Sequence, residues 1–169
     1  MNIFLDEMQD YLEDLCTKHI DIQHNTDGKR CFARFQSEEH IEEIEQSGGL
    51  NIVVIANYYG QRIGEIDEKK IRQVIKIRFA STATGANDRT TAINNAVKKA
   101  ESIMFDFMTK LQNDFEEDDC GLLRFVDFEK MSWDAFEGDW LASFYGFDLE
   151  VPFKSYMPAY DAAKWTNVP

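Results

Sequence analysis

The histidines and cysteines are the side chains here best suited to metal binding or nucleophilic catalysis. The chain has three of each, namely His19, His24, His40, Cys16, Cys31 and Cys120. A metal site needs three or four converging ligands, and these spacings match no known metal-binding motif. Cys16 and His19 lie three residues apart near a predicted helix end. Any helix brings side chains at that spacing close together, so the spacing does not indicate a catalytic Cys–His pair. We therefore expect no metal ion, no cofactor and no catalytic residue, and we expect reduced thiols, because the cysteine count is odd and CxxC is absent.

Two loops contain groups that bind ions in other proteins. Residues 114–119, DFEEDD, are acidic but lack the alternation and central glycine of an EF-hand loop. Residues 84–90, TGANDRT, lie between a predicted strand and a predicted helix, where phosphate loops occur, yet they match neither glycine-rich phosphate motif. We expect a solvated acidic loop in the first case and, in the second, a capping loop with Asp88 as N-cap rather than Arg89 as an anion ligand. Carboxylates are too abundant elsewhere to indicate a hydrolase pair.

A row of cations stands out in this acidic chain. Residues 71–81, IRQVIKIRFAS, alternate apolar side chains with Arg72, Lys76 and Arg78, which predicts three cations on one strand face. Two interpretations remain open. The cations could meet acidic residues of an identical neighbour, with residues 38–45 and 114–119 as partners, and such heterologous contacts close into rings. Alternatively, they meet acids of their own chain, or water.

Length, composition and charge narrow the class of protein. The chain has 169 residues, of which 44% are hydrophobic and 13% aromatic, so it is long enough and apolar enough for one folded domain. Its net charge of −13 disfavours specific DNA binding, although an acidic wall would let DNA pass without adhesion. Solubility is the simpler explanation of that charge. The N-terminus lacks a basic region followed by an apolar run, and no apolar run suits a bilayer, so we expect neither signal peptide nor membrane span.

Hydrophobic periodicity and turn residues predict an α+β fold. We expect a mixed or antiparallel sheet of about five to six strands, with an N-terminal helix and one long central helix packed on one face. Residues 1–155 form one α+β domain in this prediction, and Pro152 lies either at an edge of the sheet or where its nitrogen faces no neighbouring strand. The predicted elements are a helix over 2–18, a hairpin over 19–35 turning at Asp27–Gly28, a short helix over 37–47, strands over 50–60 and 71–81, a helix over 89–113, a strand over 121–130, a turn region over 131–140 and a strand over 141–155.

The last segment, residues 156–169, is predicted to be an extended aromatic tail. It contains Tyr156, Tyr160 and Trp165 among proline and small polar residues. Aromatic side chains on a tail gain little unless they dock on a surface, either of the same domain or of a neighbour. Together with Arg72, Lys76 and Arg78, these three residues are the subunit-interface residues that we predict.

The order of these segments and their residue patterns resemble those of a known family. A long helix, TTAINNAVKKAESIMFDFMTKLQND, follows two central strands, and the chain closes with the alternating segment WLASFYGFDLEVPF. This arrangement, over roughly residues 1–155, resembles the tail-terminator and tail-completion proteins of tailed bacteriophages and the related head–tail neck proteins.

The resemblance implies a structural protein that is not an enzyme. Such a protein forms a homo-oligomeric ring in the virion, after assembly in the host cytoplasm, and contacts other head or tail proteins. DNA passes nearby without being specifically bound, and no membrane is involved. The alternative is an acidic cytoplasmic adaptor that recognises a basic protein partner. Self-association discriminates between the two, since an adaptor can act as a monomer.

Overall fold

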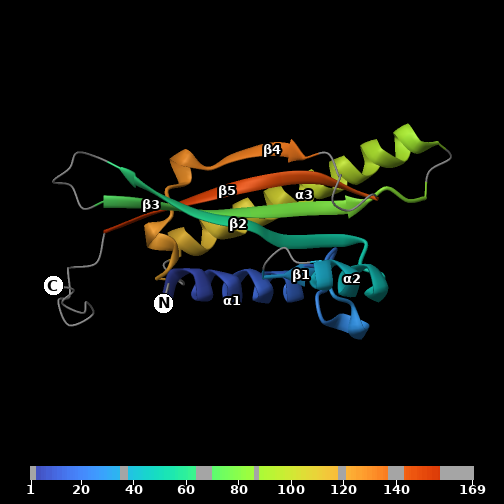
Figure 1. Ribbon diagram of the computed structural model, residues 1–169, viewed down its shortest axis with the longest axis horizontal. Helices are drawn as coiled ribbons and strands as arrows, with labels where there is room; N and C mark the ends of the chain where they lie inside the picture. The colour runs from blue at the N-terminus through green and yellow to red at the C-terminus, as the bar shows by residue number, and fades with distance from the viewer. Residues whose placement is uncertain are drawn as a thin grey trace, which may run out of the picture.

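The computed structural model describes residues 3–34, 38–63, 70–85, 88–117, 121–136 and 143–156 (Figure 1). These residues form a five-stranded mixed sheet with the order β1-β2-β3-β5-β4. Only the β1–β2 pair is parallel, and the other three pairs are antiparallel. The strands are β1 (Phe32–Ala33), β2 (Asn51–Ile63), β3 (Lys70–Thr82), β4 (Ser132–Phe136) and β5 (Phe144–Tyr156).

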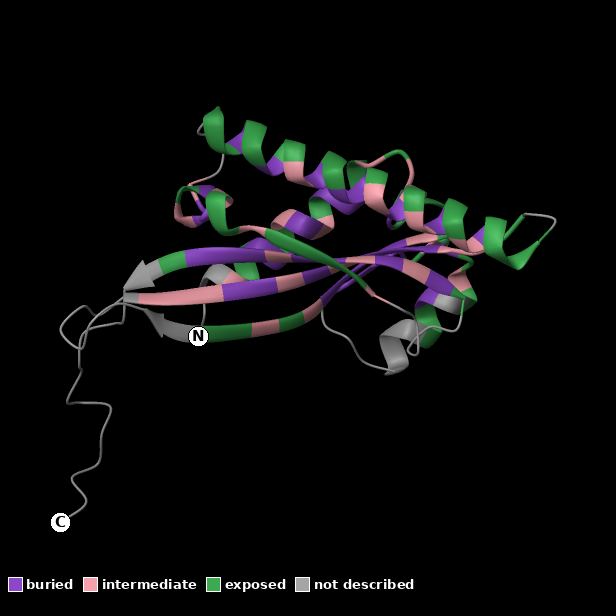
Figure 2. Cartoon of the chain, turned by 90° about the horizontal axis from the view of Figure 1, so that it is seen from above, coloured by how far each residue is buried: buried purple, intermediate pink, exposed green. Residues whose placement is uncertain are grey.

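Two helices cover one face of this sheet, and a third lies on the other. α1 (Ile3–Lys18) and the long α3 (Arg89–Glu116) pack on the first face, while α2 (Glu38–Ser47) lies opposite them at one end of the sheet (Figure 2). The predicted fold class is therefore confirmed, including the two helices that share one face. We call the face on the side of α2 the open face, because α2 covers only the part formed by Ile52, Val54 and Ala80.

The main core fills the space between the sheet and the two helices. Alternate residues of each long strand enter it, as period-two side-chain alternation requires. Its largest buried side chains include Phe79 from β3 and Phe107 from α3, whose rings meet at 5.1 Å between centroids. Apolar residues on one stripe of α3 complete the layer, namely Ala96, Ala100, Ile103, Met104 and Leu111. Nearer the start of the helix, Ile93 and Val97 are only half-buried.

Local sequence signals set the ends of α3 and its attachment to α1. The Asp88 side chain caps α3 by accepting a hydrogen bond from the Thr91 backbone N–H at 2.9 Å, so the predicted capping loop is confirmed. The pKa of Asp114, on the last turns of α3, lies below its usual value. Burial raises this pKa, but the hydrogen bonds from Lys110 and the Tyr11 hydroxyl lower it by more than burial raises it. The Tyr11 hydroxyl donates to Asp114 at 2.6 Å, which fastens α1 to α3.

The hairpin predicted over residues 19–35 is wrong. Asp27 and Gly28 do turn the chain with positive φ angles of 53° and 76°, but they lie in a short 3-10 turn, and only Phe32 and Ala33 become a strand. The reason is that the backbone N–H groups of Cys31 and Phe32 donate to the His24 ring, and no preceding strand is available to receive them.

The prediction for residues 121–140 is also wrong in part. The segment predicted as a strand forms two 3-10 turns, Leu123–Phe125 and Phe128–Lys130, while the predicted turn region contains β4. β4 pairs with β5 only as far as Glu150. Beyond that point Asp127 N–H donates to the Pro152 carbonyl at 2.8 Å, and Val126 forms an isolated antiparallel bridge with Phe153, in place of a continuous strand.

Pro152 explains why β4 stops there. Within a strand, the N and the C=O of one residue point to the same side. The Pro152 carbonyl points towards Asp127, so its nitrogen points away from β3 and breaks no bond of the β3–β5 ladder. The expectation that this nitrogen faces no strand therefore holds among the described residues.

Candidate functional site

The predicted row of cations lies on the open face, as the strand alternation requires. Arg78 makes a two-pronged ion pair with Asp148 of β5, at 2.7 Å from Nε and 2.8 Å from Nη2. Its guanidinium also lies 4.2 Å from the centre of the Phe136 ring. Lys76 lies 3.3 Å from Glu150. Two of the three cations thus meet acids of their own chain, as in the second interpretation of the sequence.

Arg72 is different from the other two. Its Nε is buried and has no hydrogen-bond partner, and no residue in the described ranges forms an ion pair with it. It faces Lys154 across the β3–β5 ladder, and that lysine is already paired with Asp127 at 2.9 Å. The Nε–H group of Arg72 is therefore a buried donor without an acceptor among the described residues.

A hollow of about 140 Å³ surrounds Arg72 on the open face, and we call it the Arg72 hollow. Its lining residues are Tyr59, Arg72, Val74, Lys130, Glu150 and Pro152. Burial raises the pKa of Tyr59, and so does the hydrogen bond between its hydroxyl and Glu150. Since Glu150 is shared with Lys76, the hollow keeps an excess of positive charge in a chain whose net charge is −13.

The three aromatic residues of the predicted interface lie at the end of the chain. Tyr156 is the last residue of β5 and pairs with Lys70, but its side chain lies outside the described residues. Tyr160 and Trp165 lie beyond residue 156, also outside them. Their role at a subunit interface stays a prediction.

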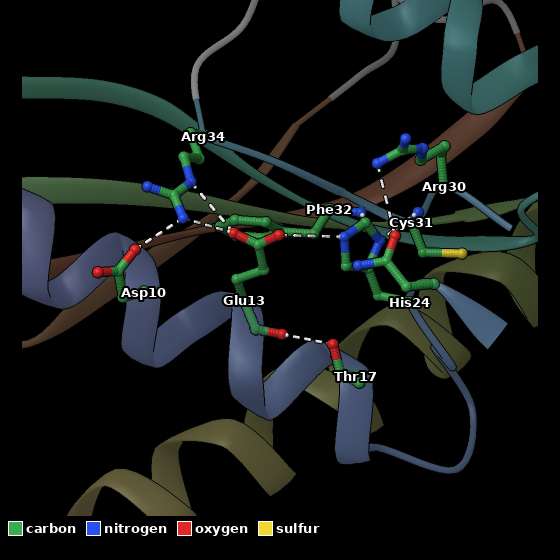
Figure 3. A network of polar contacts seen from close by, with 9 residues as sticks. Asp10, Glu13, Thr17, His24, Arg30, Cys31, Phe32 and Arg34 are labelled. Atoms are coloured by element: carbon green, nitrogen blue, oxygen red, sulfur yellow. Dashed lines mark hydrogen bonds and ion pairs between the residues drawn. The ribbon is translucent and has the colours of Figure 1, made fainter. Parts of the chain in front are cut away.

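A second polar cluster was not predicted from the sequence. We call it the His24 cluster, and it contains Asp10 and Glu13 of α1, His24, and Arg34 after β1 (Figure 3). Arg34 lies 2.6 Å from Asp10 and 2.7 Å from Glu13, and Glu13 lies 3.6 Å from His24 Nε2. The cluster borders a hollow of about 170 Å³ between α1, β1 and α2.

The hydrogen bonds of His24 determine its protonation. Nδ1 accepts from Cys31 N–H at 3.1 Å and from Phe32 N–H at 3.2 Å, so the ring proton resides on Nε2, which faces Glu13. Burial lowers the pKa of His24, and the carboxylate of Glu13 only partly opposes this. A neutral ring with its basic nitrogen occupied cannot accept a proton from a substrate. His24 therefore holds a loop together.

The described cysteines are equally unsuited to nucleophilic chemistry. Cys16 and Cys31 are buried free thiols, and burial raises the pKa of each. A thiol with a raised pKa stays protonated at neutral pH and reacts slowly. Cys120 lies outside the described residues, as do residues 118–119. Residues 114–116 of the predicted acidic loop belong to α3 instead, and Asp114 is buried, so that part of the prediction is wrong.

One further histidine lies beside a mainly apolar hollow of about 240 Å³ between α1 and α3. His19 Nε2 lies 3.3 Å from Asp106, and its Nδ1 accepts from Asp21 N–H at 3.2 Å. This ring is also held by two partners, of which one is backbone. Leu15 and Phe107 form the floor of the hollow, with Lys18 and Lys110 at its rim.

An exposed aromatic pair lies along the outer edge of the sheet. Trp133 of β4 is 43% exposed and Phe105 of α3 is 41% exposed, with their rings edge to face at 5.8 Å. β4 is the last strand of the sheet on that side, so its outer backbone groups have no strand partner within the described chain.

Within the described ranges, no three histidine, cysteine, aspartate or glutamate side chains are placed to hold a metal ion. None of the described helices combines the length and apolarity needed to cross a membrane. Comparisons with models of known protein families, with curated proteins and with solved structures found no match to this chain.

Proposed function

We propose that this chain is a self-associating structural subunit of a phage-type virion, acting as a ring-forming tail terminator or head–tail connector component. One observation carries the proposal. Three strands of 13 residues each form an open face, and among the described residues α2 covers it only at one end. An ordered, partly charged sheet face of this length is a natural surface for a second protein.

The state of the polar groups supports the same proposal. His24 and the cations Lys76 and Arg78 are all fixed by contacts within the chain, and burial keeps the thiols of Cys16 and Cys31 protonated. Because these contacts stabilise the fold, we expect none of these groups to act in catalysis. The net charge of −13 is compatible with an assembly through which DNA passes without adhering.

The test is the mass of the purified protein, by light scattering after gel filtration, at low and at high salt. The proposal expects an oligomer whose mass depends on salt, because charged contacts are screened. Negative-stain electron microscopy of that species should show closed rings. A strict monomer at every protein and salt concentration would contradict the self-association that the proposal requires.

A second candidate is an acidic adaptor for a basic protein partner. It is favoured by the exposed carboxylates on α1 and α2, including Asp6, Glu7, Asp14, Glu42 and Glu43. In this case the purified chain is a monomer that binds a basic protein, and binding weakens as salt rises. The two candidates therefore differ in the mass of the isolated protein.

A further inference from the structure

The Arg72 hollow has the chemistry of a carboxylate-binding site. Its guanidinium Nε is buried and unpaired, and Lys130 at the rim forms no ion pair within the described ranges. A planar carboxylate matches the two-pronged donor geometry of a guanidinium, as Asp148 already shows on Arg78. The Arg78 pair thus serves as an internal example of the contact that Arg72 lacks.

The same face contains an acidic element that could fill such a site. α2 reads EEHIEEIEQS, and the chain has no lysine or arginine anywhere from residue 35 to residue 61. Ile44 packs against the sheet, and Glu42 lies two residues earlier, about 200° around the helix. Glu42 is exposed and points away from its own sheet. Its carboxylate is therefore presented to whatever covers the open face.

The acidic helix and the Arg72 hollow lie at different levels along the strands. α2 covers the level of Ala80, and the Arg72 hollow lies at the level of Val74, six residues earlier on β3. At strand spacing, six residues correspond to about 20 Å. The acidic helix and its complementary hollow therefore lie on one face, side by side along the strands and too far apart to meet within one chain.

Because α2 and the Arg72 hollow lie on the same face, two copies can make both contacts at once around a single two-fold axis. If a second copy faces the first and is related to it by a 180° rotation about an axis that lies between the two sheets, parallel to them and perpendicular to the strands, each α2 lies over the Arg72 hollow of the other copy. The two helices then share one layer between two sheets, each covering the part of the face that the other copy leaves open. The centre of the contact is the level of Ile77, where Lys76 and Arg78 are neutralised by Glu150 and Asp148. Like charges do not repel there.

We propose that the open face pairs two copies of this chain through this two-fold contact, with the Glu42 carboxylate of each copy bound by Arg72 and Lys130 of the other. The inference rests on the proposed function for the premise of self-association, and it adds the contact and its symmetry. Any larger ring then contains an even number of copies, paired face to face.

Charge exchange tests the contact. Arg72→Glu and Glu42→Arg each place like charges opposite one another, so either variant should halve the mass of the wild-type assembly and weaken the pairing by about 30-fold or more. The double variant Arg72→Glu/Glu42→Arg restores an opposite-charge pair and should return the original mass. The readout is sedimentation velocity over a range of protein concentrations.

Matched controls separate this contact from a general effect of charge. Lys98→Glu and Glu7→Arg change exposed residues on α3 and α1, on the other side of the sheet, and should leave the mass unchanged. Circular dichroism and thermal unfolding confirm that each variant is folded.

Each outcome is decisive. An oligomer whose mass is unaffected by both single variants overturns the two-fold contact and leaves the proposed function standing. Loss in the single variants without rescue in the double variant overturns the Arg72–Glu42 pairing. If inorganic phosphate added to the wild-type protein dissociates the paired copies, this result supports an anion site in the Arg72 hollow. Wild-type protein that is monomeric throughout overturns both proposals.

Discussion

The two faces of the sheet come from the same strands, but they are stabilised in different ways. On the face under α1 and α3, apolar side chains of every long strand interdigitate with two helices, and Phe79 is completely buried. On the open face, the same strands present ion pairs such as Arg78–Asp148, together with the unpaired Arg72. We therefore expect the apolar packing under α1 and α3 to contribute most of the folding stability, and the ion pairs of the open face to contribute less.

The largest expected effect comes from removing a central side chain of the helical face. Phe79→Ala should lower the free energy of unfolding by about 3–5 kcal/mol, because it removes a fully buried ring and leaves a cavity against Phe107. Urea unfolding followed by circular dichroism measures it. Phe115→Ala changes a ring that is 42% exposed on α3 and serves as the control. Equal losses in the two variants would show that burial of the ring does not account for the loss of stability.

The next effect concerns the backbone contact between β3 and β5. A Cβ added to Gly146 collides with the Phe79 carbonyl oxygen and meets the Ala100 side chain at 3.0 Å. Gly146→Ala should therefore destabilise the protein by about 3 kcal/mol, at the upper end of overpacking costs, since backbone cannot move aside as a side chain can. Gly60→Ala, whose nearest neighbour would be 3.6 Å away, is the matched control in the same unfolding assay.

A smaller effect is expected from the ion pairs of the open face. Arg78→Ala leaves Asp148, whose side chain is 11% exposed, without its cation, and should cost about 2 kcal/mol. The double variant Arg78→Met/Asp148→Leu removes both charges and should recover most of that loss. If the double variant is less stable than Arg78→Ala, the pair contributes more than the avoidance of an isolated charge.

The smallest effect is a pH dependence that originates in the His24 cluster. Burial lowers the pKa of His24 in the folded protein, so the unfolded chain binds a proton at higher pH than the folded one does. The stability that this histidine contributes is complete above the unfolded pKa of about 6.5 and is lost as pH falls from there to the folded pKa. The loss should begin below about pH 6.5 and grow as the pH is lowered to 5.5.

His24→Asn provides the comparison for that pH dependence. Its side-chain oxygen can still accept from Cys31 N–H and Phe32 N–H, but the variant carries no titrating ring. Urea unfolding of both proteins at pH 7.5 and pH 5.5 should show a larger loss for the wild type. The same loss in both would mean that the acid sensitivity arises from other groups.

Several features of the fold follow from the sequence alone. The long strands and α3 are evident in it because side-chain periodicity is a local property that burial on one face imposes along each element. For the same reason, the alternation of Arg72, Lys76 and Arg78 with apolar neighbours already places these cations on one face. The Asp88 cap is equally local, since it involves residues three positions apart.

The tertiary structure decided what depends on residues distant in the chain. Asp148 becomes the partner of Arg78 only through the register of β3 and β5, which joins residues 70 positions apart. The structural role of His24, the irregular segment before β4 and the placement of α2 opposite the other helices have the same origin. In each case the hydrogen bonds or apolar contacts that a segment makes are set by the elements that surround it after folding, and no short-range pattern encodes those neighbours.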